Sequence, residues 1–336
     1  MYLQSTLLAS VLALTHFTNA LALPASKEAA VRILHQFPNG TNAENIAVRS
    51  NGHIIVNMIA PAAQMYQIDP KKPAKAALVA EFPGSTSVLG IAEIEKDIFI
   101  VSVGSLAGVS PTPGSFSIWK VDFRSLESAE GNVTRKAITT KVTSMPEAVL
   151  NNGVTAVARN SPYVLVADSG LGRVWRVDTR TGEYKCIIED PLMLPQPGNP
   201  LVIGINGLHV FGNTLYFTNT VLDGGFVAKV GIETSGPNAG AATGKAEIHS
   251  KNGSNDDFTL DKKGIIYSAT NFRNSVERMD LNGTSTTIAG GQNETILEAN
   301  TAVAFGRGKT DKEVLYVTTG GNVLPAKVVL VDLKAL

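Results

Sequence analysis

The sequence is short of cysteine, of net charge and of recognisable catalytic motifs. Among its 336 residues it has 1 cysteine, Cys186, so an intrachain disulfide and a metal site with two cysteine ligands are both excluded. Its 29 basic and 29 acidic side chains give a formal net charge of zero. This balance argues against nucleic acid or an acidic membrane surface as a partner.

Long hydrophobic runs are missing too. The apolar stretch at residues 7–14 has about eight residues, the length of a signal-peptide core and too short to cross a bilayer. We expect residues 1–20 to be a cleaved signal peptide; the alternative is a disordered apolar start, because no Lys or Arg precedes the run. N-glycosylation sequons support a route to the secretory pathway or the cell exterior. They begin at Asn39, Asn132, Asn252, Asn282 and Asn293.

Familiar catalytic signatures are also lacking. The sequence has no G-x-S-x-G elbow, no H-E-x-x-H, no P-loop and no G-x-G-x-x-G after a strand. His209 is a candidate for a channel-facing position, although a lone His on a strand is more often a packed core residue. Nothing in these patterns predicts a nucleophile activated by a neighbouring base.

What the sequence does contain is a repeated hairpin. Residues 44–56 read as a polar residue, an apolar strand, a Ser-Asn-Gly turn and a second apolar strand. The pattern recurs six times at a spacing of about 45 to 60 residues, typical of four-stranded blades. The last repeat lacks its outer strand, and residues 31–37 can supply it. We therefore predict an all-β fold, a single six-bladed β-propeller over residues 27–336, closed by the N-terminal strand. Two unrelated β-domains are the alternative, but no linker separates them.

The residue ahead of the first strand of each repeat is polar in five of the six repeats. In a propeller these positions converge at one mouth of the central channel. They are Glu44, Leu89, Asn152, Asn206, Asp256 and Asn300. Carboxylate and carboxamide oxygens suit Ca²⁺ or Mg²⁺, so Glu44, Asn152, Asn206 and Asp256 are candidate metal ligands. The alternative is that Asn and Asp simply cap backbone groups at strand entry.

The second strand of each repeat should return to the same mouth. Its exit residues then face a polar bowl; they include Asp168, Asn219, Asn271 and Thr318. Phe272, Tyr216 and Phe226 are candidate rim aromatics, and Asp168 alternatively forms a local Asx turn. Arg273 is the nearby cation, able to bind an anionic or carbonyl oxygen or to pair with Asp256 or Asp257.

The blade pattern and the set Glu44, Asn152, Asn206 and Asp256 resemble the SMP-30/gluconolactonase/LRE-like superfamily. The resemblance implies a divalent cation held by one Glu, two Asn and one Asp in this blade order. The lactonases open with a Leu-Gly-Glu-Gly-Pro-x-Trp-like stretch, whereas residues 42–47 here read Asn-Ala-Glu-Asn-Ile-Ala. The missing Gly-Pro and Trp argue against hydrolysis of a sugar lactone.

The opening Glu-Asn-Ile-Ala-Val-Arg-Ser-Asn-Gly is similar to a fungal secondary-metabolite branch, whose best understood members are hetero-Diels–Alderases. They join a tropolone o-quinone methide to a humulene-type sesquiterpene. The resemblance implies a [4+2] cyclisation of small molecules that requires no cofactor. A metal-dependent lactonase and a non-catalytic ligand-binding propeller are the alternatives. For the cyclase we expect Arg273, Asn271 and His209 as catalytic residues, and as substrate-binding residues Asn152, Asn206, Asp168, Asn219, Phe272 and Thr318.

Overall fold

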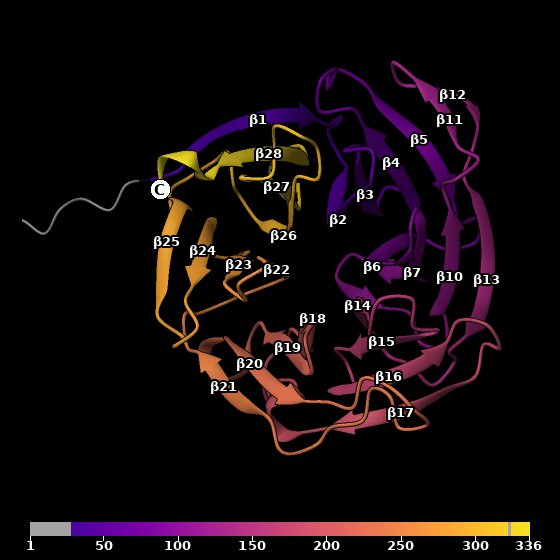
Figure 1. Cartoon of the computed structure of the whole chain (residues 1–336), viewed down its shortest axis with the longest axis vertical. Coiled ribbons are helices and arrows are strands. Elements are labelled where there is room, and N and C mark those ends of the chain that lie inside the picture. The colour runs from indigo at the N-terminus through magenta and orange to yellow at the C-terminus, as the bar shows by residue number, and fades with distance from the viewer. Residues whose placement is uncertain (1–27, 322–323) are drawn as a thin grey trace, which may run out of the picture.

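Each predicted repeat forms one four-stranded antiparallel sheet, and six such sheets surround a common axis (Figure 1). This computed structural model describes residues 28–321 and 324–336. The predicted all-β six-bladed propeller is confirmed. The proposed signal peptide at 1–20 lies outside the described residues. No helix within the described part of the chain is long and apolar enough to cross a bilayer.

The blades follow one another in chain order, each built from its innermost to its outermost strand. Blade 1 is β2 (Asn42–Val48), β3 (Ile54–Ala60), β4 (Gln64–Ile68) and β5 (Ala76–Glu81); blade 2 is β6 (Ser87–Glu95), β7 (Ile98–Gly104), β10 (Ser117–Asp122) and β13 (Ile138–Ser144). Blade 3 is β14 (Asn151–Ala156), β15 (Tyr163–Asp168), β16 (Arg173–Asp178) and β17 (Tyr184–Glu189); blade 4 is β18 (Ile205–Phe211), β19 (Thr214–Asn219), β20 (Phe226–Gly231) and β21 (Glu247–Ser250). Blade 5 is β22 (Phe258–Leu260), β23 (Ile266–Ala269), β24 (Ser275–Met279) and β25 (Ser285–Gly290); blade 6 is β26 (Asn300–Phe305), β27 (Val314–Thr319), β28 (Lys327–Asp332) and β1 (Ala30–Gln36).

Short elements decorate this ring. Two hairpins, β8 (Leu106–Ala107) with β9 (Ser110–Pro111) and β11 (Glu127–Ala129) with β12 (Asn132–Arg135), interrupt blade 2. The outer strand of blade 2, β13, follows both hairpins. Three short 3₁₀ helices occur in the described residues: η1 (Pro191–Met193), η2 (Leu222–Gly224) and η3 (Leu333–Ala335).

The N-terminal strand closes the ring as predicted. β1 pairs antiparallel with β28, from Ala30 opposite Asp332 to Gln36 opposite Lys327. The last blade thus combines the two ends of the described chain, and this pairing closes the ring.

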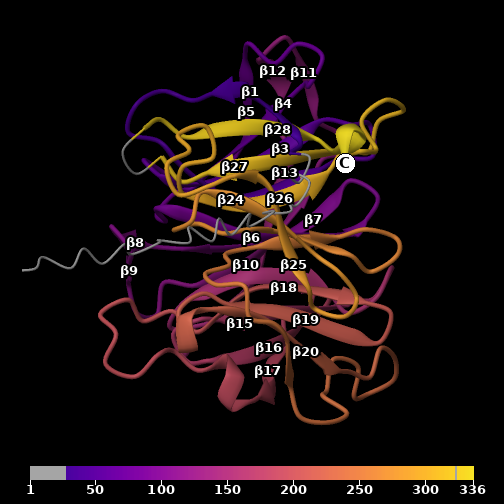
Figure 2. The ribbon, with the colours of Figure 1, turned by 90° about the vertical axis from the view of Figure 1, so that its left-hand side faces the viewer.

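The apolar core lies between neighbouring blades. One buried cluster joins blades 1 and 2 and includes Ile55 and Phe99, and another joins blades 3 and 4 through Leu165 and Phe217. Both faces of each sheet are therefore packed, which holds the six inner strands at fixed positions around the channel. The inner strands begin at one face, which we call the mouth face, on the left in Figure 2 where β8 and β9 project.

Candidate functional site

A β-bulge lies near the start of the innermost strand in five blades. The pairing register shifts between Ala43 and Asn45, Val88 and Ile91, Asn151 and Val154, Ile205 and Leu208, and Asn300 and Ala302. A bulge re-aims the side chain of the extra residue. Glu44, Asn152 and Asn206, three of the predicted metal ligands, are such bulged residues.

Glycines let the bulged strands approach one another closely. A Cβ atom on Gly90 would lie 2.3 Å from the Asn152 carbonyl oxygen, and one on Gly153 would lie 2.6 Å from that of Asn206. On Gly207 it would lie 2.3 Å from Asp257 Oδ1. The absence of side chains here brings the polar residues of successive blades together at the mouth.

Asp256 is the centre of one hydrogen-bond network. The buried carboxylate accepts from Asn206 Nδ2 at 2.7 Å and from Asn271 Nδ2 at 2.7 Å. Asn206 Nδ2 also donates to Thr220 Oγ1 at 3.0 Å. Asn206, Asp256 and Asn271 from the predicted set therefore meet in one cluster. By contrast, the side chain of Asn152 makes no hydrogen bond within the described part of the chain.

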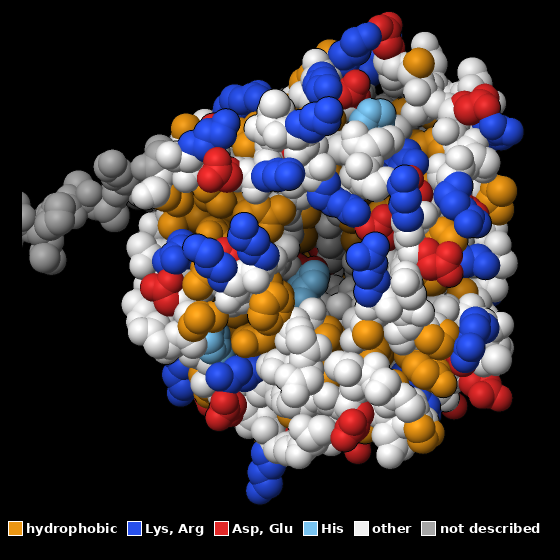
Figure 3. Space-filling view, in the orientation of Figure 1, with side chains coloured by type: hydrophobic (Ala, Val, Ile, Leu, Met, Phe, Trp, Pro, Cys, Tyr) orange, Lys and Arg blue, Asp and Glu red, His pale blue; other side chains and the backbone are white. Residues whose placement is uncertain are grey.

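Asp257 forms a second network that links three blades. Its carboxylate accepts from Asn45 Nδ2 at 2.8 Å and from the Phe258 backbone N–H at 2.7 Å, and it lies 3.0 Å from His209 Nε2. His209 thus contacts this carboxylate. Asn45 had no predicted role, and Asp257 was expected only as a partner for Arg273. Viewed from the opposite face, a hollow at the axis contains a His and an acidic side chain (Figure 3).

The carboxyl groups at the mouth hold their protons more tightly than ordinary ones. Burial raises the pKa of Glu44 well above its usual value, and the charges of Asp256 and Asp257 add to this. Burial also raises the pKa of Asp256 to about 7, against the hydrogen bonds from Asn271 and Asn206, which lower it. The group is therefore able to take up a proton near neutral pH.

The carboxylate oxygens at the mouth could hold a hard cation only together with amide oxygens. Among the described residues no three His, Cys, Asp or Glu side chains are placed to hold a metal ion. Glu44 and Asp256 together with the amide oxygens of Asn152 and Asn206 remain a donor set of the chemistry that Ca²⁺ prefers.

Three predicted substrate-binding residues lie inside the blades instead. Asp168 is fully buried and accepts from the backbone N–H groups of Leu150 and Leu171 and from Trp175 Nε1. Asp168 therefore forms the local Asx turn that the sequence offered as the alternative to a substrate-binding role. Asn219 Nδ2 donates to the carbonyls of Leu192 and Leu194 at 3.0 and 2.9 Å.

Thr318 is likewise buried, with its hydroxyl 2.9 Å from that of Thr301. The Asn300 side chain donates to the Ser275 carbonyl oxygen at 2.8 Å, so it points toward β24 of blade 5. Phe226 is fully buried, and Tyr216 packs against His249. Neither aromatic belongs to the rim.

Arg273 is held away from both aspartates. Its guanidinium donates to the Asn252 carbonyl, and Nη2 lies 3.7 Å from Glu277 Oε1. The expected pairing with Asp256 or Asp257 is therefore not found. Phe272, between β23 and β24, is exposed as predicted for a rim residue.

Apolar side chains gather on the mouth-face loops. Among the described residues, half of the exposed large hydrophobic side chains lie on connections that end or begin at this face. We call these the apolar rim: Val109, Leu194, Val202, Phe272 and Leu324. The mouth thus combines a polar floor with an apolar surround.

Comparison with known proteins gives two curated relatives and many propellers, whereas no family model matches. A Phoma sp protein named "Putative hetero-Diels-Alderase" is 31% identical over 358 aligned positions, covering 97% of each chain. The Sarocladium schorii protein asR5, of the same name, is 27% identical, covering 85% of this chain and 77% of its own.

Solved structures share the architecture. Regucalcin from Agrobacterium tumefaciens, described as a calcium-binding protein, superposes with a TM-score of 0.62 at 16% identity, covering 91% of this chain and 96% of its own. A gluconolactonase from Xanthomonas campestris gives 0.60 at 14% identity, covering 91% and 90%. At such low identity these neighbours show the fold alone.

Proposed function

The chain belongs to the hetero-Diels-Alderase family, and we propose that it catalyses an intermolecular hetero-Diels–Alder cyclisation of small molecules at the channel mouth. The observation that carries this proposal is the match to the Phoma relative along 97% of both chains. We further propose a tropolone o-quinone methide as the heterodiene and a humulene-type sesquiterpene as the alkene.

This reaction needs no nucleophile. The four-atom O=C–C=C unit and the alkene C=C combine, one C–O and one C–C bond form, and no atom or proton leaves. In the described residues, hydrogen-bonded imidazoles contact carbonyl oxygens or Asp257, and none is bonded to a Ser, Thr or Cys side chain. The lack of such a pair is compatible with catalysis by positioning and hydrogen bonding.

The mouth offers donors for the heterodiene carbonyl, on which negative charge grows in the transition state. The side chain of Asn152 has no hydrogen-bond partner in the described part of the chain, so its amide is free to donate. Burial raises the pKa of Glu44, and its protonated carboxyl is the second candidate donor. Asn206, Asn271 and His209 act as positioning residues through Asp256 and Asp257. The apolar rim suits the hydrocarbon reactant.

The side-chain oxygens at the mouth could alternatively bind a divalent cation. Glu44, Asn152, Asn206 and Asp256 would hold it, and a bound cation would polarise a carbonyl oxygen. That arrangement favours the second candidate, a metal-dependent lactonase. Loss of aldonolactone hydrolysis on EDTA treatment would support this candidate, and the absence of any lactonase activity with added Ca²⁺ would exclude it.

The test of cyclisation is incubation of the protein with a tropolone quinone-methide precursor and humulenol. Chiral chromatography should show a rate and stereoselectivity above the uncatalysed background. Asn152→Ala should lower the rate by about 10²-fold, the scale of one lost donor. Asn213→Ala, an exposed site at the opposite face, should not. Products that form with the background rate and stereochemistry in the presence of the wild-type protein would refute the proposal.

A further inference from the structure

One groove in the described structure lies at the face opposite the mouth, away from the bulged residues. It has a volume of about 1260 Å³ and runs between blades 5 and 6. Its walls come from the end of β22, from β24 and β25, from the turn between β26 and β27, and from η3. Small-molecule sites typically occupy about 300–1,000 Å³, so the groove has room for a ligand of that size.

The groove has an apolar floor. Leu260, Ile288, Phe305 and Leu333 line it, and Phe305 meets Tyr267 edge-on with the ring centroids 5.2 Å apart. These side chains are contributed by two blades and by the last short helix. A hydrocarbon or aromatic body could bury apolar area against them.

Cations crowd the rim above this floor. The five lysines there are Lys262, Lys263, Lys309, Lys312 and Lys334. No ion pair engages their amines within the described residues, whereas the nearby Arg278 is paired with Asp280 at 2.6 Å. Figure 3 shows Lys and Arg side chains beside apolar surface on this side of the ring, over β22–β25.

Few acidic groups offset these charges. Asp261 and Glu313 are the acidic residues in the lining, and Asp261 Oδ1 already accepts the backbone N–H groups of Lys263 and Ile265. Because the whole chain has a formal net charge of zero, the excess of positive charge is a local property of the groove.

We propose that this groove binds an amphipathic carboxylate, a small molecule with an apolar body and an anionic head. The floor takes the body and the lysine rim takes the carboxylate. A simple anion would leave the floor unused, and an uncharged hydrocarbon would leave five cations unpaired. The site is separate from the channel mouth, so it is independent of the proposed cyclisation.

The probe is 1-anilinonaphthalene-8-sulfonate fluorescence, with decanoate and decanol as competitors. Decanoate should displace the dye, and decanol at equal concentration should not. Lys309→Glu combined with Lys312→Glu should weaken decanoate binding about tenfold or more. Lys71→Glu combined with Lys245→Glu makes the same charge change at exposed sites outside the groove and should leave binding unchanged.

Three outcomes would overturn the proposal: equal displacement by decanol, equal affinity in the two double variants, and no decanoate binding by the wild-type protein. All four substituted lysines are exposed, so folding should be retained, and circular dichroism checks this.

Discussion

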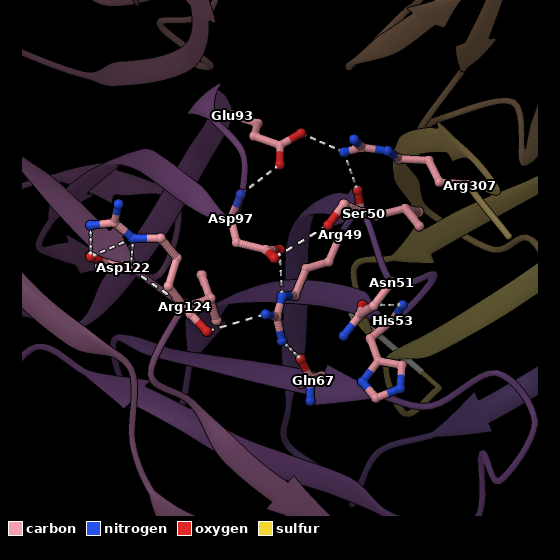
Figure 4. A network of polar contacts seen from close by, with 12 residues as sticks. Arg49, Ser50, Asn51, His53, Gln67, Glu93, Asp97, Asp122, Arg124 and Arg307 are labelled. Carbon is pink, nitrogen blue, oxygen red and sulfur yellow. Dashed lines mark hydrogen bonds and ion pairs between the residues drawn. The ribbon is translucent and has the colours of Figure 1, made fainter.

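Replacing Arg49 with alanine is expected to destabilise the propeller strongly, because its buried guanidinium links blades 1 and 2 by hydrogen bonds (Figure 4). Arg49 directly follows β2. Nε donates to Asp97 Oδ1 at 2.9 Å, Nη1 to Gln67 Oε1 at 2.6 Å and Nη2 to the Phe123 carbonyl at 3.1 Å. The partners lie on β4 of blade 1, in the turn between β6 and β7, and after β10 of blade 2.

The size of the effect follows from burial. The side chains of Arg49 and Asp97 are only 8% and 13% exposed. Truncating Arg49 leaves the Asp97 carboxylate with the Ser50 hydroxyl at 3.2 Å and removes the donor to Gln67 Oε1. The Phe123 carbonyl keeps the Leu126 backbone N–H at 3.1 Å. Removing one partner of a buried ion pair costs about 3–5 kcal/mol. We therefore expect that loss in the free energy of unfolding.

Equilibrium unfolding in urea and thermal unfolding measure the change, with Tm falling by roughly 5–8 °C. Arg124→Ala is the matched control, because Arg124 pairs with Asp122 through a side chain that is 60% exposed. Such exposed pairs contribute about 0–1 kcal/mol. The reasoning fails if Arg49→Ala costs less than 1 kcal/mol, or if the two variants are destabilised equally.

Three further predictions test the mouth and the surface. Gly207→Ala should cost about 1–3 kcal/mol in thermal unfolding through its clash with Asp257, whereas Gly244→Ala, with nothing within 4 Å, should be neutral. The raised pKa of Asp256 means that the native state binds its proton more tightly, so this carboxyl costs stability as the pH rises from about 4 to 7. Asp256→Asn should therefore gain up to about 4 kcal/mol relative to wild type between pH 4 and pH 8 in urea unfolding, and a pH-independent difference would contradict this. For protein from a secreting host, Asn282→Gln should remove a glycosidase-sensitive gel shift. Asn252→Gln should not, because the half-buried Asn252 amide is paired with Asn255 at 3.0 and 2.9 Å.

The ring was predictable because the sequence repeats the hairpin six times at a regular spacing. The last repeat lacks an outer strand, and the strand predicted at 31–37 belongs to no other repeat. The simplest arrangement pairs the two, and β1 does pair with β28. The bulges were not predictable. Both faces of an inner strand are buried, so a shift of register leaves no trace in the hydrophobic pattern.

Residue type alone could not separate site from scaffold. Asp168 ends β15 and Asp256 lies just before β22, both at the mouth face. Asp168 nevertheless accepts from backbone N–H groups, whereas Asp256 accepts from two amide side chains. The difference lies in which donors the neighbouring blade supplies, and these come from distant parts of the chain. For example, the hydrogen bond from Asn45 to Asp257 joins residues 212 positions apart.

If the mouth holds Ca²⁺ through the proposed donor set, protons and calcium should compete there, because both would bind the oxygens of Glu44 and Asp256. The closed ring holds these carboxyls buried and near Asp257, and burial first, then repulsion from Asp257, raises the pKa values of Glu44 and Asp256. If a protonated Glu44 donates to the substrate carbonyl, saturating Ca²⁺ should slow cyclisation. The inhibition should weaken as the pH falls, because protonation removes the charge that attracts the cation.

Initial rates at pH 5.5 and pH 8, with Ca²⁺ or with EDTA, measure this competition. Glu44→Gln is the informative variant, because its amide N–H can still donate while its lost charge weakens cation binding. It should keep part of the activity and become insensitive to Ca²⁺. Acceleration of the wild-type enzyme by Ca²⁺ would contradict the donor role and assign the carboxylates to metal binding instead.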